Sequence, residues 1–187
     1  AGLGQPAAAV VSYKKAISIN PKNADAYYNM GVTLQRQGKL EEARESYDNV
    51  ISINPDYVKA YHNKGNLLKE QGMLSAAVTI YKKALALEPK NSDIYCNIGA
   101  SLQEQGKLEE SIEAFNKAIS LNPEYAEAYY NMGISLQKLR EIEEAIKKYQ
   151  KAISIKANYA EAYGNIANLL KDQGKSDEAI EVYQKAI

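Results

Sequence analysis

The sequence is poor in several features that would point to particular classes of protein. It has a single cysteine, Cys96, which cannot form an internal disulfide and fits a reducing compartment. Lys plus Arg and Asp plus Glu both total 23, so no net field attracts nucleic acid or an anionic membrane surface. The apolar runs are far shorter than the roughly 20 residues of a membrane span. We therefore expect a cytoplasmic protein that binds neither nucleic acid nor membranes.

What the sequence does contain is a unit of 34 residues that returns at a constant interval. Tyrosine and leucine each hold one fixed position in every copy, as Tyr27 and Leu34 do in the first. Such self-similarity indicates a solenoid rather than a globular domain with one core. The expected boundaries are a partial repeat at 1–23, full repeats at 24–57, 58–91, 92–125 and 126–159, and a truncated repeat at 160–187, together forming one domain.

Each unit is expected to form two helices. In the first full copy they span roughly Asp25 to Gln37 and Leu40 to Ser52, with a glycine turn at Gly38 and a proline break at the end. The partial repeat supplies only a second helix, which we expect to begin at Pro6. Positions 4, 7, 8 and 11 of the first helix form a buried stripe at helical spacing: Tyr27, Met30, Gly31 and Leu34 in the first copy.

This pattern of glycine, alanine, tyrosine and proline resembles the tetratricopeptide repeat family. The resemblance implies an all-α fold, a right-handed superhelical solenoid of antiparallel helix pairs. It also implies that positions 2, 5, 6, 9, 12 and 13 of the first helices line a concave groove that binds a protein or an unstructured peptide.

Position 6 of the groove face is asparagine in every copy: Asn29, Asn63, Asn97, Asn131 and Asn165. An amide both donates and accepts, so each can pair with a peptide unit of an extended ligand of any sequence. The series resembles the asparagine ladder in the repeats of the O-linked N-acetylglucosamine transferase family. The alternative is that these asparagines are consensus residues that make only local bonds. Our further groove candidates are Tyr28, Val32, Lys59, His62, Asn66, Lys69, Cys96, Tyr130, Ile134 and Asn168.

The sequence gives little support for a catalytic function. The only histidine, His62, and Cys96 hold the fifth position of adjacent repeats, too far apart for a base and its nucleophile. Phosphate loops, zinc spacings and calcium loops are absent from the sequence. We expect no enzyme activity, no cofactor and no metal. A clamp for a chaperone's terminal carboxylate is also disfavoured, since Lys59, Asn63 and Asn66 are only fragments of that pattern.

Two functions therefore stay open. The first is a protein-interaction module that binds an extended peptide, as a fragment of a larger protein such as a transferase. The second is a self-assembling scaffold in which repeats of separate chains stack end to end or dock into each other's grooves. Uncapped terminal helices would favour it, since Ile180, Tyr183 and Ile187 would expose an apolar face.

Two positions depart from the repeat pattern. Lys64 occupies the buried seventh position, and we expect its stem to cover apolar surface while its ammonium reaches solvent. In the fourth repeat, Arg140 replaces the turn glycine and Ala157 replaces the terminal proline, so this repeat should be the least stable internal one.

Overall fold

The computed structural model describes residues 4–184, and within this range every regular element is a helix. The chain divides into two compact units, Ala1–Pro89 and Lys90–Ile187. The helices of the first unit are α1 (Gly4–Ile19), α2 (Ala24–Arg36), α3 (Leu40–Ile53), α4 (Val58–Glu70) and α5 (Leu74–Leu87). Those of the second are α6 (Ser92–Glu104), α7 (Leu108–Leu121), α8 (Ala126–Lys138), α9 (Ile142–Ile155), α10 (Ala160–Asp172) and α11 (Ser176–Gln184).

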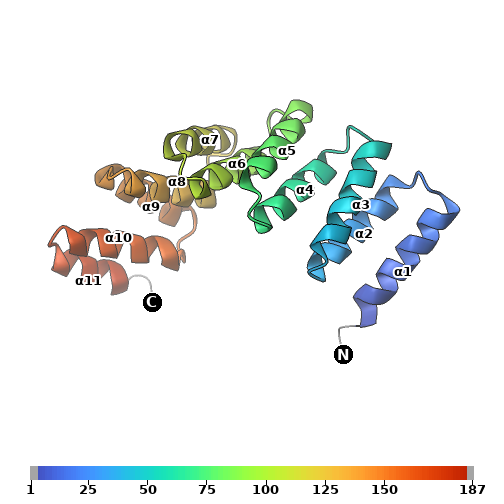
Figure 1. Ribbon diagram of the computed structural model, residues 1–187. Helices are drawn as coiled ribbons and strands as arrows, with labels where there is room; N and C mark the ends of the chain where they lie inside the picture. Colours follow the sequence, from blue (N-terminus) through green and yellow to red (C-terminus); the bar gives the residue numbers. More distant parts are fainter. Residues whose placement is uncertain (1–3, 185–187) are drawn as a thin grey trace. The chain divides into compact units, whose positions relative to one another are not determined.

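Within each unit, consecutive helices pack side by side as hairpins. The pairs α2 with α3, α4 with α5, α6 with α7, α8 with α9 and α10 with α11 are in contact, as Figure 1 shows. The two helices of each pair are joined by short turns, which makes them antiparallel neighbours. The expected all-α solenoid of antiparallel helix pairs is therefore confirmed.

The turn inside each pair requires a left-handed backbone. Gly38, Gly72, Gly106 and Gly174 have φ values between 72° and 76°, and Arg140 adopts φ 67° at the equivalent point of the fourth repeat. Glycine enters this region without steric penalty, whereas a side chain is crowded there. The expectation that this turn needs a positive φ is thus confirmed at Arg140.

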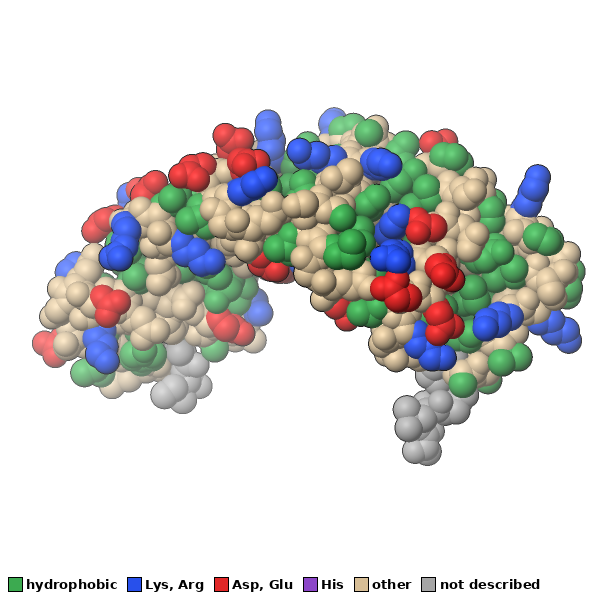
Figure 2. All heavy atoms as spheres, in the orientation of Figure 1, with side chains coloured by type: hydrophobic (Ala, Val, Ile, Leu, Met, Phe, Trp, Pro, Cys, Tyr) green, Lys and Arg blue, Asp and Glu red, His purple; other side chains and the backbone are tan. Residues whose placement is uncertain are grey.

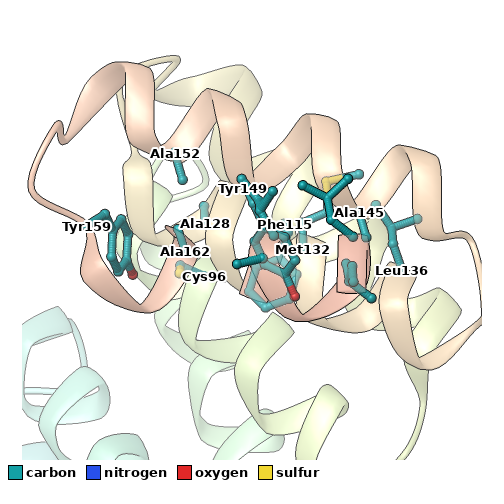
Figure 3. Packing of buried hydrophobic residues seen from close by; sticks show 14 of the residues in the cluster. Cys96, Phe115, Ala128, Met132, Leu136, Ala145, Tyr149, Ala152, Tyr159 and Ala162 are labelled. Atoms are coloured by element: carbon teal, nitrogen blue, oxygen red, sulfur yellow. The ribbon is translucent and has the colours of Figure 1, made fainter. Parts of the chain in front are cut away.

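The core of each of the first four hairpins forms where a glycine faces an aromatic ring. A Cβ placed on Gly31 would lie 2.8 Å from the ring of Tyr47, and the same close approach joins Gly99 to Phe115. The rings of Tyr47, Tyr81, Phe115 and Tyr149 are fully buried. Figure 3 shows this packing in the second unit, where Phe115 and Tyr149 lie among Met132, Leu136 and several alanines.

Some details differ from the sequence-based expectations. Helix α1 begins at Gly4, within the stretch that was expected to precede the helix, and Pro6 lies in its first turn. Position 3 of the first helix, which was not assigned to the core, is buried in every repeat: Ala26, Ala60, Ile94, Ala128 and Ala162. The tyrosine that follows it, at position 4, was expected in the buried stripe but is only partly buried in four of the five repeats. The buried stripe is therefore shifted by one residue toward the start of the helix.

Lys64 and the apolar residues of α11 are the unusual side chains at the surface. Lys64 extends its ammonium outward, as expected, but it also forms an ion pair with Asp48 of α3. The side chain of Lys64 is 16% exposed and that of Asp48 is 51% exposed. Ile180 and Tyr183 on α11 are exposed, while Ile187 lies outside the described residues.

Charged side chains of both signs are interspersed over the face of the molecule seen in Figure 2. This distribution agrees with the equal totals of acidic and basic residues in the sequence. No large area of that face carries cations alone.

Candidate peptide-binding face

The position 6 asparagines all lie in the first helix of their repeat and outside the buried stripe. Asn29 is exposed, and the other four are partly buried. Helical geometry places them opposite the close approach of glycine and aromatic ring that forms the core. Their amides are therefore placed where a ligand could reach them.

These amides differ in how they are used inside the protein. Asn63 donates from Nδ2 to the Tyr28 hydroxyl at 3.0 Å, and Asn165 donates to the Tyr130 hydroxyl at 3.4 Å. Asn97 also has an intramolecular partner. The side chains of Asn29 and Asn131 form no hydrogen bond with any residue in 4–184. The series thus combines amides that make local bonds with amides that are free to bind.

A cluster of three tyrosines flanks the asparagines in the first unit. The Tyr28 ring lies 5.2 Å from that of Tyr57 and 6.2 Å from that of Tyr47, between centroids, in tilted arrangements. Such ring pairs are favourable beyond the area they bury. The Tyr57 hydroxyl donates to Asp25 Oδ1 at 2.9 Å, and the Tyr47 hydroxyl donates to Gln35 Oε1 at 3.0 Å.

Burial controls the ionisation of these phenols. Desolvation, with a smaller contribution from Tyr28, raises the pKa of Tyr47 to about 12. Desolvation and the hydrogen bond to Asp25 raise the pKa of Tyr57 to about 12. Both tyrosines are therefore neutral hydrogen-bond donors near neutral pH rather than nucleophiles or bases.

The second unit contains the same cluster. The Tyr130 ring lies 4.8 Å from that of Tyr159 and 5.7 Å from that of Tyr149. The Tyr149 hydroxyl donates to Gln137 Oε1 at 2.8 Å, and the Lys156 ammonium lies 4.3 Å from the centre of the Tyr159 ring. Beside this cluster is an open hollow of about 450 Å³.

Equivalent contacts recur 102 residues apart, which is three repeats. The bond from Tyr47 to Gln35 corresponds to that from Tyr149 to Gln137, and the bond from Asn63 to Tyr28 corresponds to that from Asn165 to Tyr130. Two more pairs follow the same spacing: Gln71 to Glu41 with Gln173 to Glu143, and Tyr81 to Asn66 with Tyr183 to Asn168. Four contacts of the first two full repeats therefore return in the fourth and fifth repeats.

The remaining candidates also lie on or near this face. Lys59 and Asn168 are exposed, whereas Val32, Ile134, Asn66 and Lys69 are partly buried. Asn66 accepts a hydrogen bond from the Tyr81 hydroxyl at 2.6 Å, and the His62 ring packs against the Tyr81 ring with centroids 6.1 Å apart. His62 and Lys69 both have intramolecular partners.

Cys96 does not fit the expectation of a groove-lining residue. Its exposed fraction is 3%, and it belongs to the buried cluster of the second unit, as Figure 3 shows. The physical reason is the neighbouring aromatic residues: Tyr159 is buried in the same cluster and Tyr125 packs against it. Burial, followed by the influence of the Cys96 thiol, raises the pKa of Tyr125. A ligand on this face would meet those tyrosines rather than the sulfur.

Sequence reasoning missed the last position of the repeat. Tyr57 and Tyr159 hold it and contribute rings to the clusters, whereas Asn23 and Asn91 hold it elsewhere and cap the following helix with their side chains. The restriction of this position to tyrosine or asparagine, with Tyr125 as the remaining case, was the available signal. The glutamines Gln35 and Gln137 fall on the expected face, but their role as acceptors for buried tyrosines is visible only in the structure.

Two negative findings apply to the described part of the chain. Within residues 4–184, no group of three or more His, Cys, Asp or Glu side chains is placed to hold a metal ion. None of the helices between Gly4 and Gln184 combines the length and the apolar character needed to cross a membrane.

Helix pairs of constant length, a glycine and aromatic core and a polar face on the first helices define a helical-repeat protein of the solenoid class. The family described as TPR repeat matches residues 3–38, 65–106 and 99–139, and further tetratricopeptide repeat families match 24–57, 46–79 and 124–187. The chain belongs to the tetratricopeptide repeat family, and it is a protein-interaction module. No match was found among the curated proteins.

Solved structures share this fold. MamA, known from a crystal structure, shares 29% sequence identity with this chain. The match has a TM-score of 0.78 and covers 84% of this chain and 92% of MamA. MamA from Desulfovibrio magneticus RS-1 is 21% identical with a TM-score of 0.80, covering 87% and 92%. YrrB, described as a TPR protein with an unusual peptide-binding site, is 24% identical with a TM-score of 0.74, covering 94% and 90%.

Proposed function

We propose that this chain binds an extended peptide segment of a partner protein along the faces formed by its first helices. The observation that carries the proposal is the asparagine at position 6 of every repeat, with the amides of Asn29 and Asn131 unpaired among residues 4–184. An extended peptide presents an N–H and a C=O at each residue, and an amide side chain can satisfy both. YrrB supports the proposal to the extent that its described peptide-binding site lies on the same fold.

The tyrosines next to the amides supply the other half of such a site. Tyr28 and Tyr130 are partly buried and present ring edges beside Val32 and Ile134. Rings held by neighbouring rings lose little side-chain freedom when a ligand binds, which favours affinity. Backbone contacts from the amides would tolerate many sequences, while the apolar contacts would select among them.

The test compares two double variants that remove the same number of amides. Asn29→Ala with Asn131→Ala removes amides that have no intramolecular bond, so the fold should be unaffected and binding should weaken. Asn29 lies in the first unit and Asn131 in the second, so a peptide bound to either unit loses one hydrogen bond of about 0.5 to 1.5 kcal/mol, and its affinity should fall by roughly 2-fold to 13-fold. Asn63→Ala with Asn165→Ala removes amides bonded to Tyr28 and Tyr130 and should lower the melting temperature as well.

Binding would be measured by fluorescence anisotropy with peptides selected from a library of unstructured sequences, and helicity by circular dichroism. If Asn29→Ala with Asn131→Ala binds the selected peptides as tightly as the unmodified chain, the amides are consensus residues and the proposal is wrong. A library that yields no ligand would also count against it.

Self-association is a second candidate function, favoured by apolar side chains exposed on two helices. Ile19 on α1 is 76% exposed and Ile180 on α11 is 54% exposed. Apolar surface of this kind promotes contacts between copies. Light scattering at several concentrations distinguishes the two functions, because self-association requires particle mass to grow with concentration and to stop growing in Ile180→Ser.

A further inference from the structure

The hollow in the second unit has walls of three chemical kinds. It is lined by Tyr130, Ile134, Gln137, Lys138, Arg140 and Asn165, which come from α8, from the turn before α9 and from α10. Tyr130 and Ile134 give it an apolar side, Gln137 and Asn165 give it amides, and the remaining two residues are cations. No acidic residue lines it.

The two cations are available to a ligand. Lys138 and Arg140 are both exposed, and neither forms an ion pair with an acidic side chain in the described part of the chain. A few cations elsewhere in the described chain are paired, as Lys147 with Glu144. Two unpaired positive charges beside an apolar wall are complementary to an acidic residue that follows or precedes an apolar one.

Arg140 also occupies a backbone position that disfavours it. Its φ is 67°, where each of the other four turns has glycine. Backbone strain lowers the stability of the fold. A strained residue whose side chain lines a hollow is therefore a candidate for a functional role. The first unit has an equivalent tyrosine cluster but one cation fewer beside it. Arg36 stands at the position of Lys138, and Gly38 stands at the position of Arg140.

We propose that this hollow selects an aromatic or large aliphatic side chain next to an acidic one in the bound segment. The apolar side chain packs on Tyr130 and Ile134, and the carboxylate of the neighbouring Asp or Glu side chain binds Arg140, with Lys138 adding charge. The planar guanidinium pairs with a carboxylate through two parallel hydrogen bonds, which a lysine cannot do. This proposal rests on the proposed function and adds a sequence preference to it.

The experiment uses short labelled peptides with blocked ends, rich in Gly, Ser and Asn, that carry one central pair. The pairs are Phe-Asp, Phe-Asn and Ala-Asp, and a further peptide ends in Phe with a free terminal carboxylate. Fluorescence anisotropy gives the affinity of each for the full chain and for Arg140→Gly, Arg140→Lys and Lys117→Ala. Lys117 is an exposed cation on α7 outside the hollow and serves as the matched control.

Phe-Asp should bind about tenfold more tightly than Phe-Asn. Arg140→Gly should abolish this preference while the protein stays folded, because glycine suits the turn, and Arg140→Lys should reduce it. Lys117→Ala should leave it unchanged. Ala-Asp should bind as weakly as Phe-Asn, since it lacks the apolar group.

Equal affinity for Phe-Asp and Phe-Asn, or a preference that survives in Arg140→Gly, would overturn the proposal. Tighter binding of the peptide with the free terminal carboxylate would overturn the assignment to an acidic side chain. If Phe-Asp and Phe-Asn bind equally but the selected library peptides bind more weakly to Asn29→Ala with Asn131→Ala, this inference fails and the proposed function stands. If no probe binds, this inference fails, and the library selection decides the proposed function separately.

Discussion

Tyr149 lies so close to Gly133 that a Cβ on the glycine would be 2.6 Å from Cε1 of the tyrosine ring. The ring is fully buried and cannot move aside without disturbing its neighbours. We predict that Gly133→Ala destabilises the protein by about 1 to 3 kcal/mol, as expected for overpacking. Thermal unfolding followed by circular dichroism measures this change.

The fifth repeat supplies the control for that substitution. Ala167 holds the position equivalent to Gly133. Because an alanine is already accommodated there, Ala167→Gly should change the free energy of unfolding only by about 1 kcal/mol, the ordinary penalty of glycine in a helix. A higher melting temperature for Gly133→Ala would contradict the packing argument.

Arg140→Gly should stabilise the protein. A left-handed conformation costs an ordinary residue about 1 to 2 kcal/mol, and the greater freedom of glycine in the unfolded chain takes back about 0.5 to 1 kcal/mol. The net gain of about 0 to 1.5 kcal/mol should appear as a small rise in melting temperature. In the matched variant Gly38→Ala, where φ is 74°, the melting temperature should fall.

Hydrogen exchange tests the same point locally. Residues 126–159 should be the least protected internal repeat in the unmodified chain and should gain protection in Arg140→Gly. Finding these residues best protected of all repeats would refute the prediction.

Stability should fall in alkali because a buried phenol resists ionisation. Desolvation raises the pKa of Tyr47 to about 12, whereas an unfolded tyrosine titrates near pH 10. Below about pH 10 the stabilisation is fully present; as pH rises toward about 12 the unfolded state loses the proton first, so unfolding becomes easier. Tyr47 alone accounts for a loss of about 2 to 3 kcal/mol across this window.

Melting temperatures measured across this alkaline range test the prediction, with Tyr47→Phe as the comparison. The third repeat naturally carries Phe115 at this position, so phenylalanine fits the site. The variant should show a shallower decline with pH. An equal decline in both proteins would assign the effect to other tyrosines.

Lys64→Met should keep or raise the melting temperature. Methionine occupies this position as Met30 and Met132 in other repeats, and both are buried. The substitution breaks the ion pair with Asp48, but that carboxylate is 51% exposed and stays hydrated, so the loss should be under about 1 kcal/mol. Thermal unfolding of Lys64→Met beside Asp48→Asn measures it; a clear fall in Lys64→Met would show that the pair matters.

The repeat pattern was sufficient to predict the helices and much of the core, because these depend on spacing within one repeat, although it missed the buried position 3. Gly31 and Tyr47 recur in register, and their contact follows from helix geometry. The binding face was harder to predict, because it depends on contacts between neighbouring repeats whose sequences differ. Whether Asn63 is free or bonded is decided by Tyr28 of the preceding repeat, and Cys96 is covered because Tyr125 lies beside it.

The recurrence of the same hydrogen bonds after 102 residues has a consequence for how this array can be altered. Deleting or adding one repeat would preserve the fold but change the partners at the new junction; without the first full repeat, for example, Asn63 would lose its bond to Tyr28. Deleting or adding three repeats would return an equivalent partner to that junction. Shortened or extended versions should therefore be built in blocks of three repeats.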